Sequence, residues 1–530
     1  MSFKFTKFTW WLLVTCSVIT FAAAGPYVMW YYLAGGLAVF ALLLGVHVRN
    51  HTVWGWLRIR RRSTSPKLIP EQAVRYGLDQ SGLVWDGNRI TVLVEVAQKP
   101  FTITQVASNG RITAPELPLT DLRRNCLVQY DIHTNAVEFN TIGYRFALSD
   151  RASSVLASVV GPLPMPLSAK TVASVSVTLD GSLDSAYARM DRGRSPDGLA
   201  RTAQIAAQRL QRELERNGFE ARVLGSGAVQ GIHNDVLRQV GSPLIHPSWG
   251  QCGKRHSVNT VSYALLPAHW KDEDYADACT LPYHRQYTSV KLSRNRHHRE
   301  HLDAPNTDHA EVLMTYVTSD PAALSGAPSY GLRRLSGQQR DSLTRFLPAA
   351  RTNEVLSPGR DLAENEDLGF ALRPGGLGVY VGPSKDRERI FVSLTPSETP
   401  LHVIGPLLLA QQFVLRMSCQ ALRINVAVDT PEWERFVADR DSELVSWKSD
   451  RAYDAIVMTP IQYETNKPVG KIVILVSDEL PSVRPECWIT VKGTTGVVES
   501  RRRQVKFKWE ITSSESAWLH TGPADVGTRS

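Results

Sequence analysis

The sequence predicts a cytoplasmic body of mixed α+β and α/β character behind an N-terminal two-helix transmembrane hairpin. Three observations support this prediction. The first 62 residues contain seven Lys or Arg and no Asp or Glu. The stretch from Phe8 to Val48 contains none of these four residue types. Beyond residue 62, segments whose hydrophobic residues alternate with period two are interspersed with amphipathic helical segments, which indicates a body of mixed secondary structure.

Two apolar segments form the predicted hairpin. Phe8–Ala24 and Tyr27–Val48 each approach the length of about 20 apolar residues that a helix needs to cross a hydrocarbon core. Gly25-Pro26 supplies the turn between them. Lys and Arg are retained on the cytoplasmic side, so we expect an inner-membrane protein whose N-terminus and main body are cytoplasmic. The basic residues that would fix this topology are Lys4, Lys7, Arg49, Arg58, Arg60, Arg61 and Arg62.

A cleaved signal peptide is the alternative for the first apolar segment, because a basic start and Ala22-Ala23-Ala24 fit a cleavage site. The second segment would then act as a stop-transfer and still leave the body cytoplasmic. Small residues in the second segment, Gly35 and Gly36 among them, allow a neighbouring helix to approach closely. These glycines could pack the hairpin on itself or against other membrane-spanning subunits, and both interpretations stay open.

Composition and turn residues divide the chain into five regions. A proline-dense break at Gly161–Pro166 is expected to be a loop or hinge between lobes. The regions are the hairpin with its basic flank at 1–62, a β-rich region at 63–165, an α+β region at 166–350, a C-terminal α/β lobe at 370–510 and a frayed tail at 522–530.

Local patterns predict the elements of the first two body regions. Alternating valines and isoleucines predict a strand at Arg89–Val96. A helix is expected to start at Ser195, its N-cap, and to stop at Gly218. Further strands are predicted at Phe101–Val106, Thr171–Leu179, Phe219–Val223, Val258–Leu266, Tyr287–Leu292 and Glu311–Thr318, and another helix at about Gly337–Leu347.

The C-terminal lobe has a different pattern. A short strand at Leu401–Ile404, a helix from Leu407 to about Leu422 and a strand at Ile424–Val428 predict a small βαβ unit. Gly378–Val381 and Ile390–Leu394 are expected to pair with each other. Further buried strands are predicted at Ala455–Met458, Ile472–Val476 and Trp488–Val491.

Charge and cysteine content exclude two classes of protein. The formal net charge is +9, and the seven early Lys and Arg supply most of it. The basic run Trp56–Arg62 is therefore expected to lie against anionic lipid headgroups, and it does not indicate a nucleic-acid-binding protein. Six cysteines are widely scattered without a Cys-x-x-Cys pair, which suits a reducing compartment and argues against a disulfide scaffold.

No complete catalytic or cofactor-binding pattern is present. Gly405 lies between a strand and a helix, where phosphate can bind at a helix N-terminus, but Pro406 and three leucines replace the other glycines of a dinucleotide fingerprint. No G-x-x-x-x-G-K-[ST] sequence occurs. We interpret Gly405 as a packing turn that lets helix and strand approach, with nucleotide binding as the alternative.

Two polar clusters invite a metal-site hypothesis. The segment Asn295–His309 carries four histidines, His297, His298, His301 and His309, but lacks the H-E-x-x-H spacing. We interpret it as a solvated polar loop. Asp272-Glu273-Asp274 and Asp439-Arg440-Asp441 match the D-x-D pattern that can hold a divalent cation through oxygen ligands. A membrane-anchored transferase of the nucleotide-sugar type is therefore the alternative function.

The chain resembles the EccE family, a membrane component of the type VII (ESX) secretion system of mycobacteria and related actinobacteria. The resemblance begins with the hairpin and continues in Val74–Arg145, which contains RYGLDQSGLVWDGNRITVLVEV. It also covers Leu199–Asn217, Leu335–Pro348 and Val403–Met417. It is a pattern of hydrophobic blocks and contains no catalytic motif.

The resemblance implies a non-enzymatic structural subunit without a cofactor. Family members assemble with EccB, EccC and EccD, and ATP hydrolysis belongs to EccC. The membrane and EccB-, EccC- and EccD-type subunits are therefore the expected partners, and nucleic acid is not. Some family members are shorter, so the resemblance does not make the 370–510 lobe essential to every function of the family.

Overall fold

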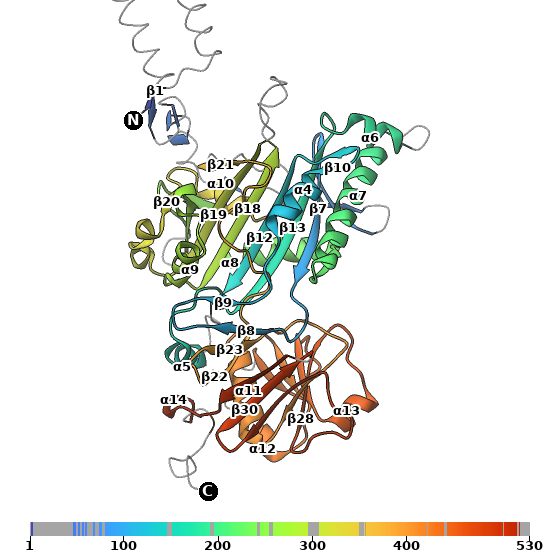
Figure 1. Ribbon diagram of the computed structural model, residues 1–530, viewed down its shortest axis with the longest axis vertical. Helices are drawn as coiled ribbons and strands as arrows, with labels where there is room; N and C mark the ends of the chain where they lie inside the picture. Colours follow the sequence, from blue (N-terminus) through green and yellow to red (C-terminus); the bar gives the residue numbers. More distant parts are fainter. Residues whose placement is uncertain are drawn as a thin grey trace, which may run out of the picture.

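The structure is a computed structural model. It describes residues 80–516 apart from 146–150, 191–194, 241–243, 254–257, 295–306, 349–354, 356, 421, 439–442 and 502. Before residue 80 it describes 2–3, 46–48, 51–52, 56–57, 59–60, 67–68 and 74–76, and after residue 516 only Leu519. Figure 1 shows a larger upper body and a smaller C-terminal lobe, joined by a third, bridging sheet.

A 14-stranded sheet forms the upper body. Its centre is an antiparallel ladder in which β12 (Ala136–Tyr144) pairs with β13 (Ser168–Thr178) on one side and with β18 (Arg285–Arg294) on the other. Next to these lie β7 (Arg89–Ala97) and β19 (Asp308–Thr318). The remaining strands are β4 (Lys67–Leu68), β5 (Val74–Tyr76), β6 (Gly82–Asp86), β14 (Glu220–Val223), β15 (Leu244–Pro247), β16 (Cys252–Gly253), β17 (Asn259–Leu265), β20 (Leu332–Arg334) and β21 (Gly359–Leu362).

Helix α7 (Ser195–Arg216) covers one face of this sheet. The predicted alternation of β7 is confirmed, since Ile90, Val92, Val94 and Val96 are all buried on this face. They meet a stripe of α7 that consists of small and branched side chains. The helix lies close to the sheet because three of these residues are alanines. The stripe is formed by Ala203, Ala206, Ala207, Leu210 and Leu214.

Helices α8 (Ser226–Val240) and α10 (Gln339–Thr344) pack against the opposite face. Helix α10 is shorter than the predicted Gly337–Leu347, because Gly337 adopts φ +78 and cannot belong to a right-handed helix. At the end of α7, Gly218 has φ +87, which confirms the predicted stop. The other helices are α4 (Leu119–Leu127), α5 (Arg151–Val160), α6 (Leu183–Ala188) and α9 (Asp272–Thr280), with 3₁₀ turns at Pro267–His269, Pro321–Leu324 and Ala327–Tyr330.

The sequence regions 63–165 and 166–350 share this one sheet. Strand β12 comes from the first region, and both of its partners come from the second. The two regions therefore fold together. Local hydrophobic patterns identify strands but contain no information about which strands pair across more than a hundred residues.

A four-stranded bridging sheet joins the two bodies. Strands β22 (Val379–Pro383) and β23 (Arg389–Val392) pair as predicted, and β8 (Ile103–Val106) and β9 (Ile112–Thr113) complete the sheet from a distant part of the chain. Figure 1 shows this sheet between the body and the lobe. Its residues share one hydrophobic core with α5 and the C-terminal lobe. The C-terminal core therefore includes residues that precede residue 370 by more than 200 positions.

The C-terminal lobe contains an eight-stranded sheet with a parallel centre. Strand β24 (Leu401–Ile404) is followed by α11 (Leu407–Ser418) and then β25 (Ile424–Val426). We expected a compact βαβ unit, but two later strands lie between β24 and β25. The other elements are β26 (Val445–Trp447), β27 (Ala455–Met458), β28 (Ile472–Ser477), β29 (Cys487–Lys492), β30 (Thr495–Ser500), β31 (Arg503–Lys508), α12 (Pro431–Ala438), α13 (Pro460–Thr465) and α14 (Ser513–Ser516).

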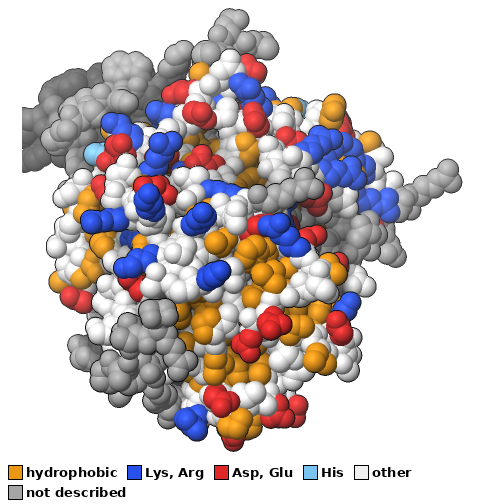
Figure 2. Space-filling view, turned by 60° about the horizontal axis from the view of Figure 1, so that its bottom comes forward, with side chains coloured by type: hydrophobic (Ala, Val, Ile, Leu, Met, Phe, Trp, Pro, Cys, Tyr) orange, Lys and Arg blue, Asp and Glu red, His pale blue; other side chains and the backbone are white. Residues whose placement is uncertain are grey.

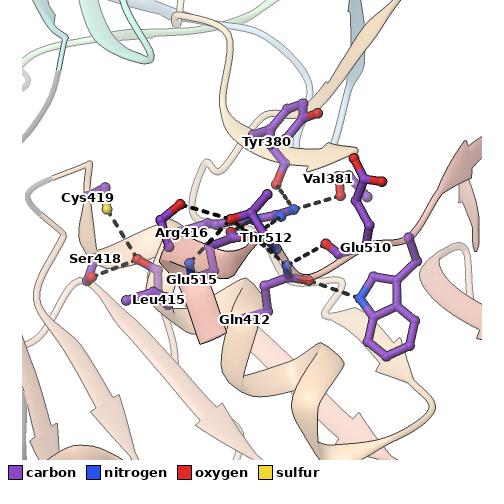
Figure 3. A network of polar contacts seen from close by, with 12 residues as sticks. Tyr380, Val381, Gln412, Leu415, Arg416, Ser418, Cys419, Glu510, Thr512 and Glu515 are labelled. Carbon is purple, nitrogen blue, oxygen red and sulfur yellow. Dashed lines mark hydrogen bonds and ion pairs between the residues drawn. The ribbon is translucent and has the colours of Figure 1, made fainter. Parts of the chain in front are cut away.

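A buried ion pair between α11 and α14 connects this lobe to the bridging sheet (Figure 3). The side chains of Arg416 and Glu515 are 5% and 2% exposed and form two contacts, 2.8 Å and 3.2 Å long. Arg416 Nη1 also donates to the β22 carbonyl of Val381 at 2.7 Å. Gln412 Nε2 donates to Glu515 Oε2 at 3.0 Å. Burial would raise the pKa of Glu515, but Arg416 and these hydrogen bonds hold that pKa below its ordinary value.

We expect Glu515→Gln to destabilise the C-terminal lobe, because the Arg416 guanidinium would stay buried without its counter-charge. Breaking a buried pair costs about 3–5 kcal/mol. Hydrogen exchange of α11 measures the loss, and Glu434→Gln, a change at an exposed position of α12, is the matched control. Because the pKa of Glu515 is depressed, the pair stabilises the fold above the unfolded pKa and is lost as pH falls through the folded pKa. Equal acid sensitivity of the wild type and Glu515→Gln would contradict this assignment.

Candidate functional site: the N-terminal docking region

The first described residues of the chain pair with residues at the end of the apolar stretch. Strands β1 (Ser2–Phe3), β2 (Val46–Val48) and β3 (His51–Thr52) form a small antiparallel sheet. Ser2 lies opposite His47, and Phe3 opposite Val46. The chain therefore leaves this sheet after residue 3 and returns to it by residue 46. We expected Val46–Val48 to end the second apolar helix, but these residues form a strand, for which β-branched valines are well suited.

A short helical segment just after β3 packs onto the upper body. The rings of Trp56 and Trp249 are 5.7 Å apart between centroids. Ile59 is 7% exposed and packs beside Gly337. A Cβ atom at Gly337 would come within 2.3 Å of Ile59 Cγ2 and 2.9 Å of Trp249 Cζ3. We call Trp56, Ile59, Trp249 and Gly337 the docking region.

Glycine is required at position 337 for two independent reasons. Its φ of +78 is unfavourable for L-residues with side chains, and any side chain would displace Ile59 or Trp249. Its amide also donates to the carbonyl of Trp249 at 2.7 Å. The docking region therefore fixes where the N-terminal segment joins the body. The sequence showed Trp56 and Ile59 only as part of a basic run, and nothing local indicated their partners.

Most of the predicted topology residues lie outside the described part of the chain. Arg60 is described and has an exposed side chain. The described residues do not include the packing residues Gly35 and Gly36 or the apolar segments up to residue 45. They also do not include the other predicted topology residues, Lys4, Lys7, Arg49, Arg58, Arg61 and Arg62. Among the helices that are described, none has the length and hydrophobicity to cross a bilayer.

The backbone conformation explains the glycine at position 405. We expected a glycine that lets the helix and the strand approach closely, and this expectation is wrong. Its φ is +142, a conformation that residues with side chains rarely adopt. A Cβ atom there would lie 3.5 Å from Leu409 Cδ2, which is an ordinary contact. Leu409 is buried, and Leu407 and Leu408 pack against the same core. The start of α11 is therefore lined with hydrophobic side chains.

The acidic cluster of α9 makes contacts within the protein. Asp272 Oδ1 accepts a hydrogen bond from the amide of Ala371 at 2.7 Å, and Asp274 Oδ2 lies 3.2 Å from His269 Nδ1. The two carboxylates are thus directed to different partners. In the described residues, no group of three His, Cys, Asp or Glu is arranged to hold a metal ion. The Asp439–Asp441 cluster and His297, His298 and His301 lie outside the described residues.

His309 and the buried cysteines also make contacts within the protein. His309 Nδ1 lies 2.7 Å from Asp361 Oδ1, which joins β19 to β21. Five cysteines of the described part of the chain are buried and form no disulfide: Cys126, Cys252, Cys279, Cys419 and Cys487. Burial raises the pKa of the Cys126 thiol to about 12, with the same value for Cys252 and Cys279. These three side chains therefore stay as neutral thiols.

A cleft of about 1130 Å³ separates α9 from the bridging sheet. Its α9 wall is acidic, and partial burial together with Asp274 and Glu273 raises the pKa of Asp277. Its opposite wall is basic, and there Arg389 Nη1 donates to the carbonyls of Val160 and Pro162. The sequence did not predict this cleft, because its walls come from distant segments. Its charged lining includes Arg111, Glu116, Asp272, Glu273, Asp277, Arg373, Arg387 and Arg389.

Comparisons with known proteins show which sequences this chain is similar to. Residues 168–265, from β13 to β17, match the family model described as "Putative type VII ESX secretion system translocon, EccE". The ESX-1 secretion system protein EccE1 of Mycolicibacterium smegmatis is 28% identical over 432 residues, which cover 78% of this chain and 81% of that protein. The ESX-5 secretion system protein EccE5 of Mycobacterium tuberculosis is 24% identical over 374 residues, 65% of this chain and 86% of the relative.

The family match includes the centre of the upper body, and the relatives extend over most of the chain. The resemblance inferred from the sequence blocks is therefore confirmed. The chain is thus similar to EccE proteins of type VII (ESX) secretion systems, through the family model at its centre and through relatives that extend over most of its length.

Proposed function

We propose that the protein is a non-enzymatic structural subunit of a type VII secretion membrane complex. In this proposal a transmembrane hairpin anchors it in the inner membrane, and EccB-, EccC- and EccD-type subunits are its partners. The observation that carries the proposal is the pairing of β1 with β2, which places residues 2–3 beside 46–47. A chain that leaves and returns at one point fits an even number of membrane crossings.

Length and charge support two crossings with cytoplasmic ends. Residues 4–45 provide enough chain for two spans of about 20 residues with a tight turn. Lys and Arg flank the apolar stretch on both sides, and Lys and Arg are retained in the cytoplasm. The docking region then holds the body directly beneath the membrane, because only a few residues separate β3 from Trp56.

The C-terminal lobe lies at the end of the molecule opposite β1 (Figure 1). It would therefore extend away from the membrane into the cytoplasm. Figure 2 shows hydrophobic side chains gathered on the surface at this end, with most of the basic side chains in view above them. We propose this lobe as a surface for protein partners. Large hydrophobic side chains exposed on it are Ile461, Val469, Leu480 and Val483.

The contacts of the candidate catalytic residues support a structural role. The D-x-D carboxylates of α9 bind a backbone amide and a histidine of the same body. The start of α11 after Gly405 is filled by leucines. Asp272 and Glu273 also line the cleft beside α9, but the contacts of Asp272 and Asp274 with Ala371 and His269 direct the two carboxylates to different partners.

The first prediction concerns topology. Reporters fused at the N-terminus and after Ser65 should both be cytoplasmic, because the basic flanks hold both ends of the hairpin inside. Replacing Arg58, Arg60, Arg61 and Arg62 by Glu should reduce correct insertion, whereas replacement by Lys should not. A periplasmic signal from the second fusion would refute the hairpin. Normal insertion of the Glu variant would show that these four residues do not determine the topology.

The second prediction concerns assembly. Replacing Gly35 and Gly36 by Leu should leave membrane insertion intact but reduce incorporation into the large secretion complex, because bulky side chains keep neighbouring helices apart. Native-gel migration of the complex, compared with the total membrane level of the protein, measures this. Gly35→Ala with Gly36→Ala is the matched control with small side chains. An unchanged complex with both leucines would show that this helix face does not mediate assembly, and loss of the protein from the membrane would favour packing of the hairpin on itself.

A further inference from the structure

Four large hydrophobic side chains are exposed together around α6, at the edge of the upper body. They are Tyr130, Leu179, Leu183 and Tyr187, with exposed fractions of 90%, 37%, 45% and 61%. We call these residues the α6 patch. Tyr130 is at the tip of a hairpin formed by β10 (Val128–Gln129) and β11 (Ile132–His133), and the other three belong to α6 or lead into it.

Tyr130 is unusual in both exposure and backbone conformation. It has φ +56 in a two-residue turn, where glycine or asparagine is normally found. Neither the turn nor the hydrophobic core gains from a tyrosine at this position. The Tyr130 ring contacts the Arg209 guanidinium, yet most of its surface stays exposed and is available for contact with something outside the chain.

Hydrogen bonds hold the parts of the α6 patch in one rigid arrangement. Ser185 Oγ lies 3.1 Å from Asp131 Oδ2, and Ser182 Oγ donates to the carbonyl of His133 at 3.0 Å. These contacts join α6 to the hairpin. The amide of Leu179 donates to the carbonyl of Asn88 at 2.9 Å, which fixes the entry to α6 on the main sheet. The hydrophobic side chains are thus presented outward by a fixed frame.

Two arginines and one aspartate lie beside the patch. Arg189 Nη1 lies 2.6 Å from Asp131 Oδ2, and the guanidinium of Arg209 lies 5.2 Å from the centre of the Tyr130 ring and 3.9 Å from the same aspartate. Tyrosines with leucines beside arginines are the composition of a membrane–water interface. Asp131 offsets only one of the two arginine charges, so attraction to anionic headgroups would add to the hydrophobic and aromatic contact.

Figure 1 shows α6 and β10 at the same end of the molecule as β1, away from the C-terminal lobe. We infer that the α6 patch rests on the headgroup region of the bilayer and is a second membrane contact besides the anchor. This inference rests on the proposed transmembrane hairpin. Together the docking region and the α6 patch would fix the tilt of the body on the membrane surface.

The experiment uses the full chain in nanodiscs whose lipids include one with a headgroup nitroxide. Cys16→Ala leaves the five buried cysteines, which a thiol-reactive fluorophore does not reach in the folded protein. Tyr187→Cys then carries the fluorophore on the α6 patch. Val483→Cys, at a position 80% exposed on the C-terminal lobe, is the matched control. One protein per disc excludes contact with a second copy.

The fluorophore at position 187 should lose at least about half its emission, because interfacial groups lie within about 5–10 Å of the headgroup boundary. The fluorophore at position 483 should lose none. The loss should be at least as large in anionic discs as in neutral ones, because the charged side chains beside the patch are net positive. A protein that inserts but shows equal emission at positions 187 and 483 would overturn the inference and leave the anchor intact; cross-linking of position 187 to a subunit of the complex would then identify a protein partner. Failure to insert would overturn the anchor and the patch together.

A second variant tests whether the two tyrosines themselves make the contact with the bilayer or whether this part of the protein only lies near it. Tyr130→Gly with Tyr187→Ser removes both tyrosines, and glycine fits the positive φ of position 130 without strain. With the fluorophore at Leu183→Cys, this double variant should lose most of the quenching seen in its parent while keeping or raising the melting temperature. Undiminished quenching would show that the tyrosines do not make the contact.

Discussion

Strand β12 is the element on which the rest of the structure depends. All nine of its residues pair with β13 on one side and with β18 on the other. This double pairing brings segments more than a hundred residues apart into one rigid sheet. The docking region and the α6 patch are both carried by this sheet, since Trp249 precedes β16 and α6 follows β13. The relative position of these two features is therefore set by backbone pairing and not by a flexible linker.

The second constraint is the shared core of the bridging sheet and the C-terminal lobe. Strand β8 brings residues near 105 into contact with residues near 390, and Arg416 connects α11 to both α14 and β22. The proline-dense segment before β13 contributes Leu163 and Met165 to this core, so it is a packed connection between the two bodies. The lobe is consequently positioned by several independent contacts at the far end from β1.

Local patterns predicted single elements well and their pairing poorly. Residues close together in the sequence determine three features that were predicted correctly: the alternation of β7, the end of α7 at Gly218 and the bounds of β24. The insertion of β27 and β28 between β24 and β25 could not be predicted, because it depends on chain topology. The docking of Ile59 against Gly337 was missed for the same reason. Helix α8 was also missed, since its glycines weaken the local helical signal. Blocks of hydrophobic residues nevertheless sufficed to recognise the EccE family.

In the proposed topology the apolar stretch leaves and re-enters the protein at one point beside the body. A distance measurement between spin labels at Ser2→Cys and His47→Cys, in the full chain in a bilayer with Cys16→Ala, tests it most directly. Paired strands place opposite Cα atoms about 4.5–5.5 Å apart, so the account predicts a short distance even after the label arms are included. Labels on opposite sides of the membrane would be separated by about 30 Å or more. That longer distance would contradict the hairpin and with it the proposed orientation of the body.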